Sequence, residues 1–142
     1  EASFKMTNAG DGIRRAPMSL ALKGEEIFAF SIREVPASIG SLIRHAQQDI
    51  SNINYFVMHQ ANKLMNETIR KKLKVEPEKT PYSLDEFGNT SSASIPLTMV
   101  TRLAEQLKRP QKLLLSGFGV GLSWGNLLID SQPISCLPLI EV

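Results

Sequence analysis

The chain has little of several features that particular classes of protein require. Its 142 residues include one cysteine and two histidines, which excludes an internal disulfide and makes a structural zinc site or other metal centre unexpected. The formal net charge is only +2, and no repeat or alternation of aromatic and basic residues favours nucleic-acid binding. No apolar run approaches the roughly 20 residues of a membrane-spanning helix. We therefore expect a reducing, cytoplasmic setting, with neither nucleic acid nor membrane as a partner.

The first residues of the chain also lack familiar features. Residues 1–5 carry no basic leader followed by an apolar segment, so no secretory signal is expected. They lack an initiator methionine as well, which indicates that upstream sequence is missing. With 42% apolar and 21% charged residues, the 142 positions fit one globular domain of common size.

What the chain does contain is a clear order of helix patterns. Apolar residues recur every three or four positions over residues 25–50, which predicts one long amphipathic helix with a single buried stripe. Pro36 lies inside this stretch and should kink or split the helix, because proline removes a backbone hydrogen bond. A second helix is predicted over residues 61–73. A third should follow the serines within 91–94, whose hydroxyls are candidate caps.

Strand patterns surround these helices. Weak alternation predicts a short strand over residues 1–7, followed by an irregular surface loop as far as about residue 24, and the apolar run 55–58 predicts a buried parallel strand. Residues 112–118 and 122–130 read as a tight hairpin joined by 119–121. The order predicts an α/β domain over residues 1–132, with crossover helices on a mostly parallel sheet and a C-terminal antiparallel hairpin. Residues 133–142 are predicted to form an irregular tail.

Two polar motifs suggest a chemistry for this domain. His59 begins the motif HQAN at 59–62, directly after the predicted strand, and Asn89 follows thirty positions later in the motif GNTSSAS at 88–94. In open α/β sheets, sites assemble at the carboxyl ends of strands. A histidine and an asparagine held together can donate N–H groups to a thioester oxygen that becomes negative as a carbanion forms. The pair needs a nucleophile as third member, and the chain contains no obvious one.

Four stretches together resemble the C-terminal half of the 3-oxoacyl-[acyl-carrier-protein] synthase III family, condensing enzymes of the thiolase superfamily. They are 22–28 (LKGEEIF), 59–62 (HQAN), 88–94 (GNTSSAS) and 118–125 (FGVGLSWG), in the family's order and near its spacings. The resemblance implies one half of a thiolase-like fold with a mostly parallel five-stranded sheet. It also implies an N-terminal half as partner, and a homodimer when the protein is intact.

The family uses a Cys-His-Asn triad, and the resemblance identifies His59 and Asn89 as its catalytic histidine and asparagine. The cysteine would lie in the N-terminal half, which this chain lacks. The implied reaction condenses an acyl group from acyl-CoA, held on that cysteine, with malonyl-acyl carrier protein, with loss of CO₂ and without a cofactor. The isolated chain is accordingly expected to be inactive.

The resemblance also implies residues that bind substrate. Asn62 matches a residue that bonds the pantetheine arm, Phe118 an aromatic residue over the active site, and Val120 a backbone N–H aimed at the acyl oxyanion. Val120 departs from the family, which often has glycine there, and so the loop is less free. Proline is common in the family where this chain has Met58.

The acyl-carrier contact segment of the family matches Gln60, Ala61, Asn62, Lys63 and Leu64. A frequent arginine at its end is Leu64 here, and Lys63 beside it can supply the charge. The basic run at 70–74 is either a carrier-docking patch or a solvated helix C-terminus that complements the helix dipole.

Simpler interpretations exist for single residues. A lone histidine at a strand end is usually structural, and His45 is read in that way, but Asn89 and the flanking motif favour a catalytic role for His59. Asn89 could form only a turn, and Asn62 could be only an N-terminal helix residue. Cys136 lies in the proline-flanked tail without a histidine nearby in sequence, so we read it as structural or incidental.

Three functions remain open from the sequence. The first is the C-terminal half of a condensing enzyme of fatty-acid synthesis. The second is a related acyltransferase on the same fold, which passes an acyl group to an oxygen or nitrogen nucleophile in a secondary-metabolite pathway. The third is a non-catalytic module that binds acyl carrier protein. The sequence does not define the acyl primer.

Overall fold

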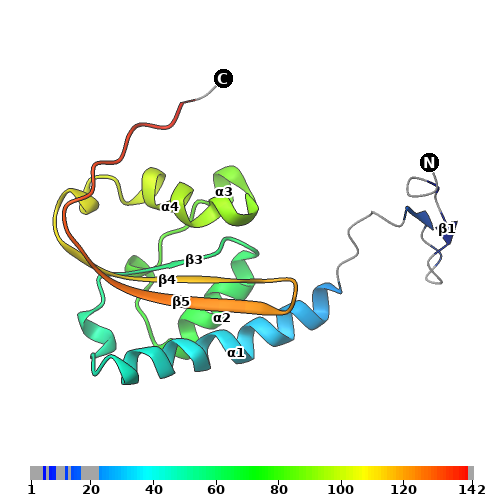
Figure 1. The fold of residues 1–142 in the computed structure, drawn as a ribbon, viewed down its shortest axis with the longest axis horizontal. Helices are drawn as coiled ribbons and strands as arrows, with labels where there is room; N and C mark the ends of the chain where they lie inside the picture. The colour runs from blue at the N-terminus through cyan, green and yellow to red at the C-terminus, as the bar shows by residue number, and fades with distance from the viewer. Residues whose placement is uncertain (1–4, 6, 9–11, 13, 17–22, 141–142) are drawn as a thin grey trace.

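The main body of the protein is a small sheet with helices on both faces (Figure 1). The computed structural model describes residues 5, 7–8, 12, 14–16 and 23–140. The sheet has the order β3-β4-β5, in which β3 (Tyr55–Met58) pairs in parallel with β4 (Gln111–Gly119). Strand β4 pairs antiparallel with β5 (Ser123–Ser131). The predicted α/β class and C-terminal hairpin are confirmed.

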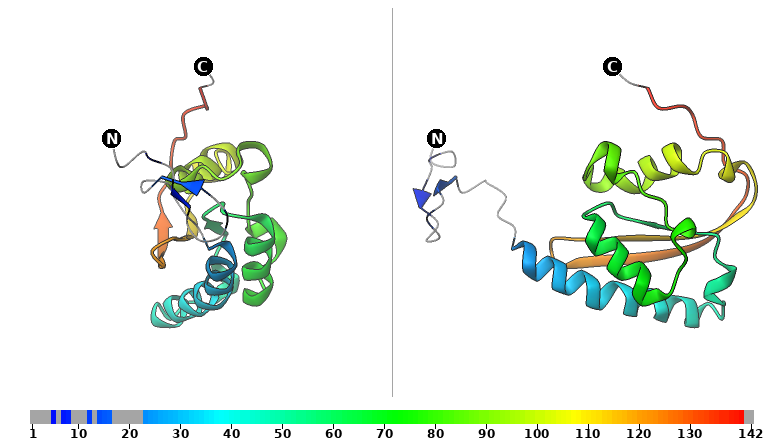
Figure 2. Two further views of the ribbon diagram at one scale, coloured as in Figure 1. Left: turned by 90° about the vertical axis from the view of Figure 1, so that its right-hand side faces the viewer. Right: turned by 180° about the vertical axis from the view of Figure 1, so that it is seen from behind.

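Helices form a layer on each side of this sheet. Helices α1 (Gly24–His45) and α2 (Lys63–Leu73) cover one face, and α4 (Ser94–Arg102) covers the other, with the short α3 (Leu84–Phe87) beside it (Figure 2). Short 3₁₀ turns occupy Ile50–Asn52, Pro77–Lys79, Ser91–Ala93 and Gln106–Lys108.

Alternation along β3 and β4 supplies both halves of the core. Phe56 and Leu114 pack toward α1 and α2, whereas Val57 and Leu113 join the cluster beneath α4. All four side chains are buried. Since successive strand residues point to opposite faces, an apolar residue at every position predicts a strand covered on both sides.

The five-stranded, mostly parallel sheet expected from the resemblance is not what the described residues form. They give this sheet three strands, with one parallel and one antiparallel pair. A further parallel strand needs its own crossover connection, and the described part of the chain contains only the one between β3 and β4. The strand predicted over residues 1–7 and the loop after it lie largely outside the described residues. The short pair β1 (Thr7–Asn8) and β2 (Arg14–Arg15) belongs to this region.

Helix α1 continues through Pro36, so the predicted split does not occur. Pro36 has no N–H to offer the carbonyl of Ile32, one turn earlier. The Nζ of Lys72, on α2, donates to that carbonyl at 2.8 Å instead. The packing of Val35 and Ile39, both fully buried, holds the two sides of the proline in one helix.

The second predicted helix is confirmed as α2. Asn62 is its N-cap, and the side-chain oxygen of Asn62 accepts a hydrogen bond from the N–H of Met65 at 3.2 Å. Lys74 ends the helix in the left-handed conformation, and the basic residues of the last turn complement the helix dipole.

The predicted tail has no helix or strand over the described residues 132–140, yet part of it is packed. The N–H of Ile134 donates to the carbonyl of Leu107 at 2.7 Å. Ile134 and the half-buried Cys136 lie against the cluster beneath α4. Within the described residues, no helix is both long and apolar enough to cross a membrane. The domain boundary at residue 132 stays a prediction.

Candidate active site

His59 follows β3 directly, and its backbone is held on both sides. The N–H of His59 donates to the carbonyl of Ser116 on β4 at 2.8 Å, which extends the parallel pairing by one residue. The carbonyl of His59 accepts from Nδ2 of the buried Asn66 at 3.0 Å. The sheet and helix α2 together therefore fix the point from which the imidazole projects.

The imidazole of His59 is also oriented. Its Nδ1 lies 2.7 Å from Oγ of Ser94, the first residue of α4. The ring of Phe118 packs edge-on against it, with 5.6 Å between ring centroids and 79° between the planes. Burial lowers the pKa of His59 below its usual 6.5, although a backbone hydrogen bond with Ser91 acts in the opposite direction. The imidazole is therefore neutral at neutral pH.

Asn89, in the second motif, lies near His59, and both residues line the same pocket. It follows Gly88, whose φ of 65° is a left-handed value that suits glycine. The side-chain oxygen of Asn89 accepts the N–H of Ser91 at 2.9 Å, so the amide nitrogen of Asn89 is the group left for other partners. The side chain is exposed at the edge of a pocket.

This pocket brings together most of the predicted catalytic and substrate-binding residues. It is an open hollow of about 780 Å³, lined by His59, Asn89, Phe118 and Val120 among others. Asn62 is not among the lining residues. The pocket combines neutral donors with an apolar wall, which suits a substrate whose oxygen gains charge during reaction.

The glycine-rich hairpin forms one wall of this pocket. Gly121 has a φ of 145°, and a Cβ there would lie 3.0 Å from Oγ and 3.2 Å from the backbone nitrogen of Ser123. Only glycine fits such a position. Val120 is 55% exposed beside it and lines the hollow.

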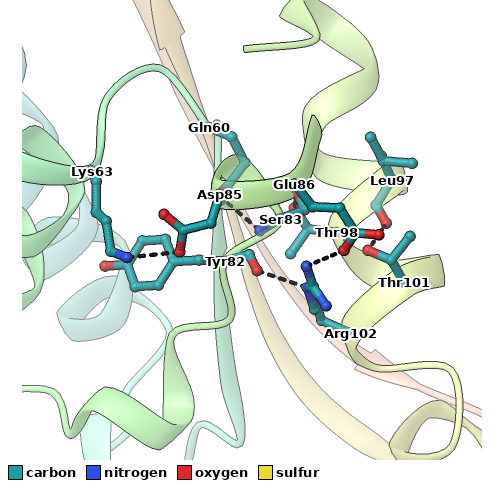
Figure 3. Close-up of polar contacts among 10 residues, drawn as sticks. All are labelled: Gln60, Lys63, Tyr82, Ser83, Asp85, Glu86, Leu97, Thr98, Thr101 and Arg102. Carbon is teal, nitrogen blue, oxygen red and sulfur yellow. Dashed lines mark hydrogen bonds and ion pairs between the residues drawn. The ribbon is translucent and has the colours of Figure 1, made fainter. Parts of the chain in front are cut away.

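The predicted carrier-binding segment divides into exposed and buried residues. Leu64 is 67% exposed, and Lys63 is also at the surface, where its Nζ pairs with Asp85 at 2.7 Å (Figure 3). Ala61 is partly buried against the core, and Asn62 is exposed at the start of α2.

Gln60 differs from its neighbours, because its side chain is fully buried. Its Nε2 donates to the carbonyl of Met58 at 2.8 Å, and its Oε1 accepts the N–H of Ser83 at 3.3 Å (Figure 3). The structure therefore does not support a carrier contact by the side chain of Gln60. Burial of a polar side chain that has internal partners indicates a structural role.

The sequence interpretation missed the role of Ser94. It predicted that serine hydroxyls would cap the third helix, but neither α4 nor the 3₁₀ turn before it has a side-chain cap. The hydroxyl of Ser94 lies against His59 instead. A contact between residues 35 positions apart leaves no signal in local sequence periodicity.

Two residues that the sequence analysis read as structural or incidental lie away from this pocket. His45 is exposed in the last turn of α1, and Cys136 lies in the tail, and neither lines the hollow. Within the described part of the chain, no three histidine, cysteine, aspartate or glutamate side chains gather as a metal site.

Several known proteins are similar to this chain in sequence and in fold. Beta-ketoacyl-[acyl-carrier-protein] synthase III of Streptococcus gordonii is 44% identical over 114 residues, which is 78% of this chain and 35% of that protein. A crystal structure of a 3-oxoacyl-(acyl-carrier protein) synthase from Burkholderia xenovorans LB400 is 36% identical, with a TM-score of 0.85 over 90% of this chain and 37% of that one. A crystal structure of a 3-oxoacyl-(acyl-carrier-protein) synthase III is 37% identical, with a TM-score of 0.81 over 92% of this chain and 39% of the other.

The fold and the placement of the histidine and asparagine motifs define one half of a thiolase-like α/β protein. The chain spans about a third of the length of the curated relatives that it matches. A sequence model described as "3-Oxoacyl-[acyl-carrier-protein (ACP)] synthase III C terminal" matches residues 43–131, so the chain belongs to this family.

Proposed function

We propose that this chain is the C-terminal half of a condensing enzyme of fatty-acid synthesis, and that His59 and Asn89 are its oxyanion donors. The observation that carries the proposal is their position at one open pocket, with the His59 ring anchored through Nδ1. The match to the synthase III family supports the reaction type.

In the proposed reaction, a cysteine of the N-terminal half first takes the acyl group from acyl-CoA, and CoA leaves as the thiol. His59 and Asn89 then donate to the thioester oxygen of malonyl-acyl carrier protein. The malonyl carboxylate leaves as CO₂, and its bonding electrons form the enolate that these donors stabilise. The enolate carbon attacks the acyl carbonyl, the cysteine leaves as a thiolate, and the 3-oxoacyl product stays on the carrier.

The carrier would approach the side of α2 that begins at Asn62. Lys63 and Leu64 are exposed there, and Lys71 is an exposed cation farther along the same helix. Val120 would offer its backbone N–H to the acyl oxygen. Because the nucleophile is assigned to the other half, the isolated chain is proposed to be inactive.

The test uses His59→Ala and Asn89→Ala in a complete protein that contains this chain. Each substitution should reduce condensation by about 10²–10³-fold, since one oxyanion donor is lost. Labelling of the protein by radioactive acyl-CoA should persist, because these donors serve the enolate and not the first acyl transfer. His45→Ala, on an exposed residue outside the pocket, is the matched control.

Condensation at the wild-type rate by both variants would refute the assignment. Acyl labelling without condensation in the wild-type protein would favour transfer to an oxygen or nitrogen nucleophile. Carrier binding without any labelling would favour the non-catalytic module.

A further inference from the structure

Ser94 is only 1% exposed, and its hydroxyl contacts one ring nitrogen and one backbone nitrogen. Its Oγ accepts the backbone N–H of Gln60 at 3.2 Å and lies 2.7 Å from Nδ1 of His59. A hydroxyl has one proton to donate and two lone pairs with which to accept. The Gln60 contact uses a lone pair, so the proton of Ser94 still needs an acceptor.

Nδ1 of His59 is the acceptor that meets this need. Among the residues that the structure describes, Oγ of Ser94 makes no hydrogen bond other than these two. Leaving a buried hydroxyl proton without an acceptor is unfavourable, so the proton of Ser94 belongs on the line to Nδ1. A nitrogen that accepts a hydrogen bond carries no proton, which leaves the proton of a neutral imidazole on Nε2.

We infer that Ser94 is a positioning residue that holds His59 in the tautomer with its proton on Nε2. The ring then presents an N–H, and not a lone pair, from its free side to the pocket that His59 lines. Use of this N–H as an oxyanion donor rests on the proposed function. The tautomer itself does not, so the two can fail separately.

A second set of contacts fixes Ser94 in turn. Oγ1 of Thr98 donates to the carbonyl of Ser94 at 2.7 Å and also lies 2.7 Å from Oγ of Ser83. All three residues are buried. Figure 3 shows Ser83 and Thr98 facing each other between α3 and α4. Thr98 and Ser83 hold the first turn of α4, and neither forms a hydrogen bond with the imidazole of His59. Substitution of Thr98 is therefore a control that perturbs the same helix.

The backbone of Ser91 supplies the competing state. The backbone of Ser91 raises the pKa of His59, against the larger effect of burial, so it favours a ring N–H on the side of Ser91. Donation from Nδ1 to the Ser91 carbonyl would give the opposite tautomer, with the lone pair of Nε2 facing the pocket. The two states differ in the ¹⁵N chemical shifts of the ring nitrogens, and can therefore be distinguished directly.

The experiment is long-range ¹H–¹⁵N correlation spectroscopy on the uniformly ¹⁵N-labelled chain, at a pH where both imidazoles are neutral. The chain has only two histidines, and His45→Gln assigns their signals. The exposed His45 gives the tautomer ratio of an unconstrained ring. We expect His59 to show a single tautomer, with Nδ1 at the shift of an acceptor and Nε2 at that of an N–H.

Ser94→Ala should move the Nδ1 shift of His59 toward the protonated value, and Ser94→Thr, which keeps the hydroxyl, should restore the wild-type shift. Thr98→Val should leave both ring shifts unchanged. If Ser94→Ala does not fold, Ser94→Cys carries the same test with a weaker donor of similar size. The inference is overturned if wild-type His59 has its proton on Nδ1 or a ratio no more biased than that of His45, or if removal of the hydroxyl leaves the shifts unchanged.

Discussion

Burial separates the polar residues of this protein into those that act on neighbours within the chain and those that face outward. Gln60 and Ser94 are enclosed and committed to internal contacts, whereas Asn89 and Lys63 are exposed. The Glu67 carboxylate is intermediate. It accepts bonds from Nε and Nη2 of Arg70 and from the hydroxyl of Tyr82, at distances between 2.7 and 3.2 Å.

These contacts predict how stability changes in acid. The bond from Arg70, followed by that from Tyr82, lowers the pKa of Glu67 from 4.5 to about 2. The folded-state pKa is depressed, so the stabilisation is complete above pH 4.5 and is lost as pH falls toward about 2. In urea denaturation across this range, Glu67→Gln should be less stable than the wild type above pH 4.5 and should lose less stability on acidification. Parallel declines for the two proteins would contradict this role.

At the scale of whole elements, the ends and interruptions of helices determine how the site is held. Asn62, three residues after His59, caps helix α2. The buried Asn66 on this helix donates a hydrogen bond to the carbonyl of His59. A helix that begins at the correct residue therefore places the imidazole as well. The structure shows Asn62 as the N-cap, and its contact with the pantetheine arm stays a prediction.

The cap predicts a specific pattern of variants. Asn62→Ala should lower the free energy of unfolding by about 1 kcal/mol, because the N–H of Met65 loses its acceptor. Asn62→Ser, which can still cap, should stay close to the wild type. Urea denaturation measures both. Equal destabilisation by alanine and serine would show that the side chain is needed for something other than the cap.

Because of Pro36, the stability of α1 should depend on a hydrogen bond from Lys72 on α2. Lys72→Met keeps the apolar stem but removes the donor to the carbonyl of Ile32, and should cost about 1 kcal/mol in the free energy of unfolding. Lys71→Met changes an exposed lysine on the same helix turn and is the matched control. Thermal and urea unfolding should separate the two variants. Similar losses in both would assign the effect to charge and not to the proline.

At the scale of the whole molecule, the face of β5 that points away from α1 has no helix over it. Residues of β5 that face α1 are packed, as in the edge-on contact of Phe30 with Trp124 at 5.1 Å between centroids. Leu127 is 56% exposed, and α4 covers β3 rather than β5. Beyond β5 the described residues place no further strand, so its nine residues form a long edge.

This surface predicts self-association of the isolated chain. Long unprotected edges and exposed apolar residues favour pairing between copies. Light scattering should show a mass that rises with concentration, and Leu127→Lys should reduce the rise. Leu64→Lys, on α2, should not. A strict monomer at high concentration would refute the prediction. Ile39 on α1 and Ile69 on α2 are fully buried within the chain, so they do not contribute to this surface.

Sequence reasoning succeeded where the pattern is local and failed where partners are distant. The patterns at residues 61–73 and 112–118 predicted α2 and β4, and the two motifs that contain His59 and Asn89 do meet at one pocket. The carbonyl left without a donor by Pro36 accepts a hydrogen bond from a lysine on another helix, and no rule of local propensity could identify that lysine. The five-stranded sheet implied by the resemblance was likewise not found, since the described residues form a three-stranded sheet and a separate two-stranded pair.

The contacts that hold the backbone and ring of His59 have a consequence for the order in which the protein folds. Its backbone bond to Ser116 and its ring contact with Ser94 both join positions far apart in the chain. Each closes a long loop, and loop-closure entropy makes such contacts slow to form compared with the turns of α1 or α2. The helices can therefore form early, whereas the geometry of the imidazole is completed only when β3 and β4 come together and α4 docks. We therefore expect the pocket around His59 to reach its final geometry among the last events of folding.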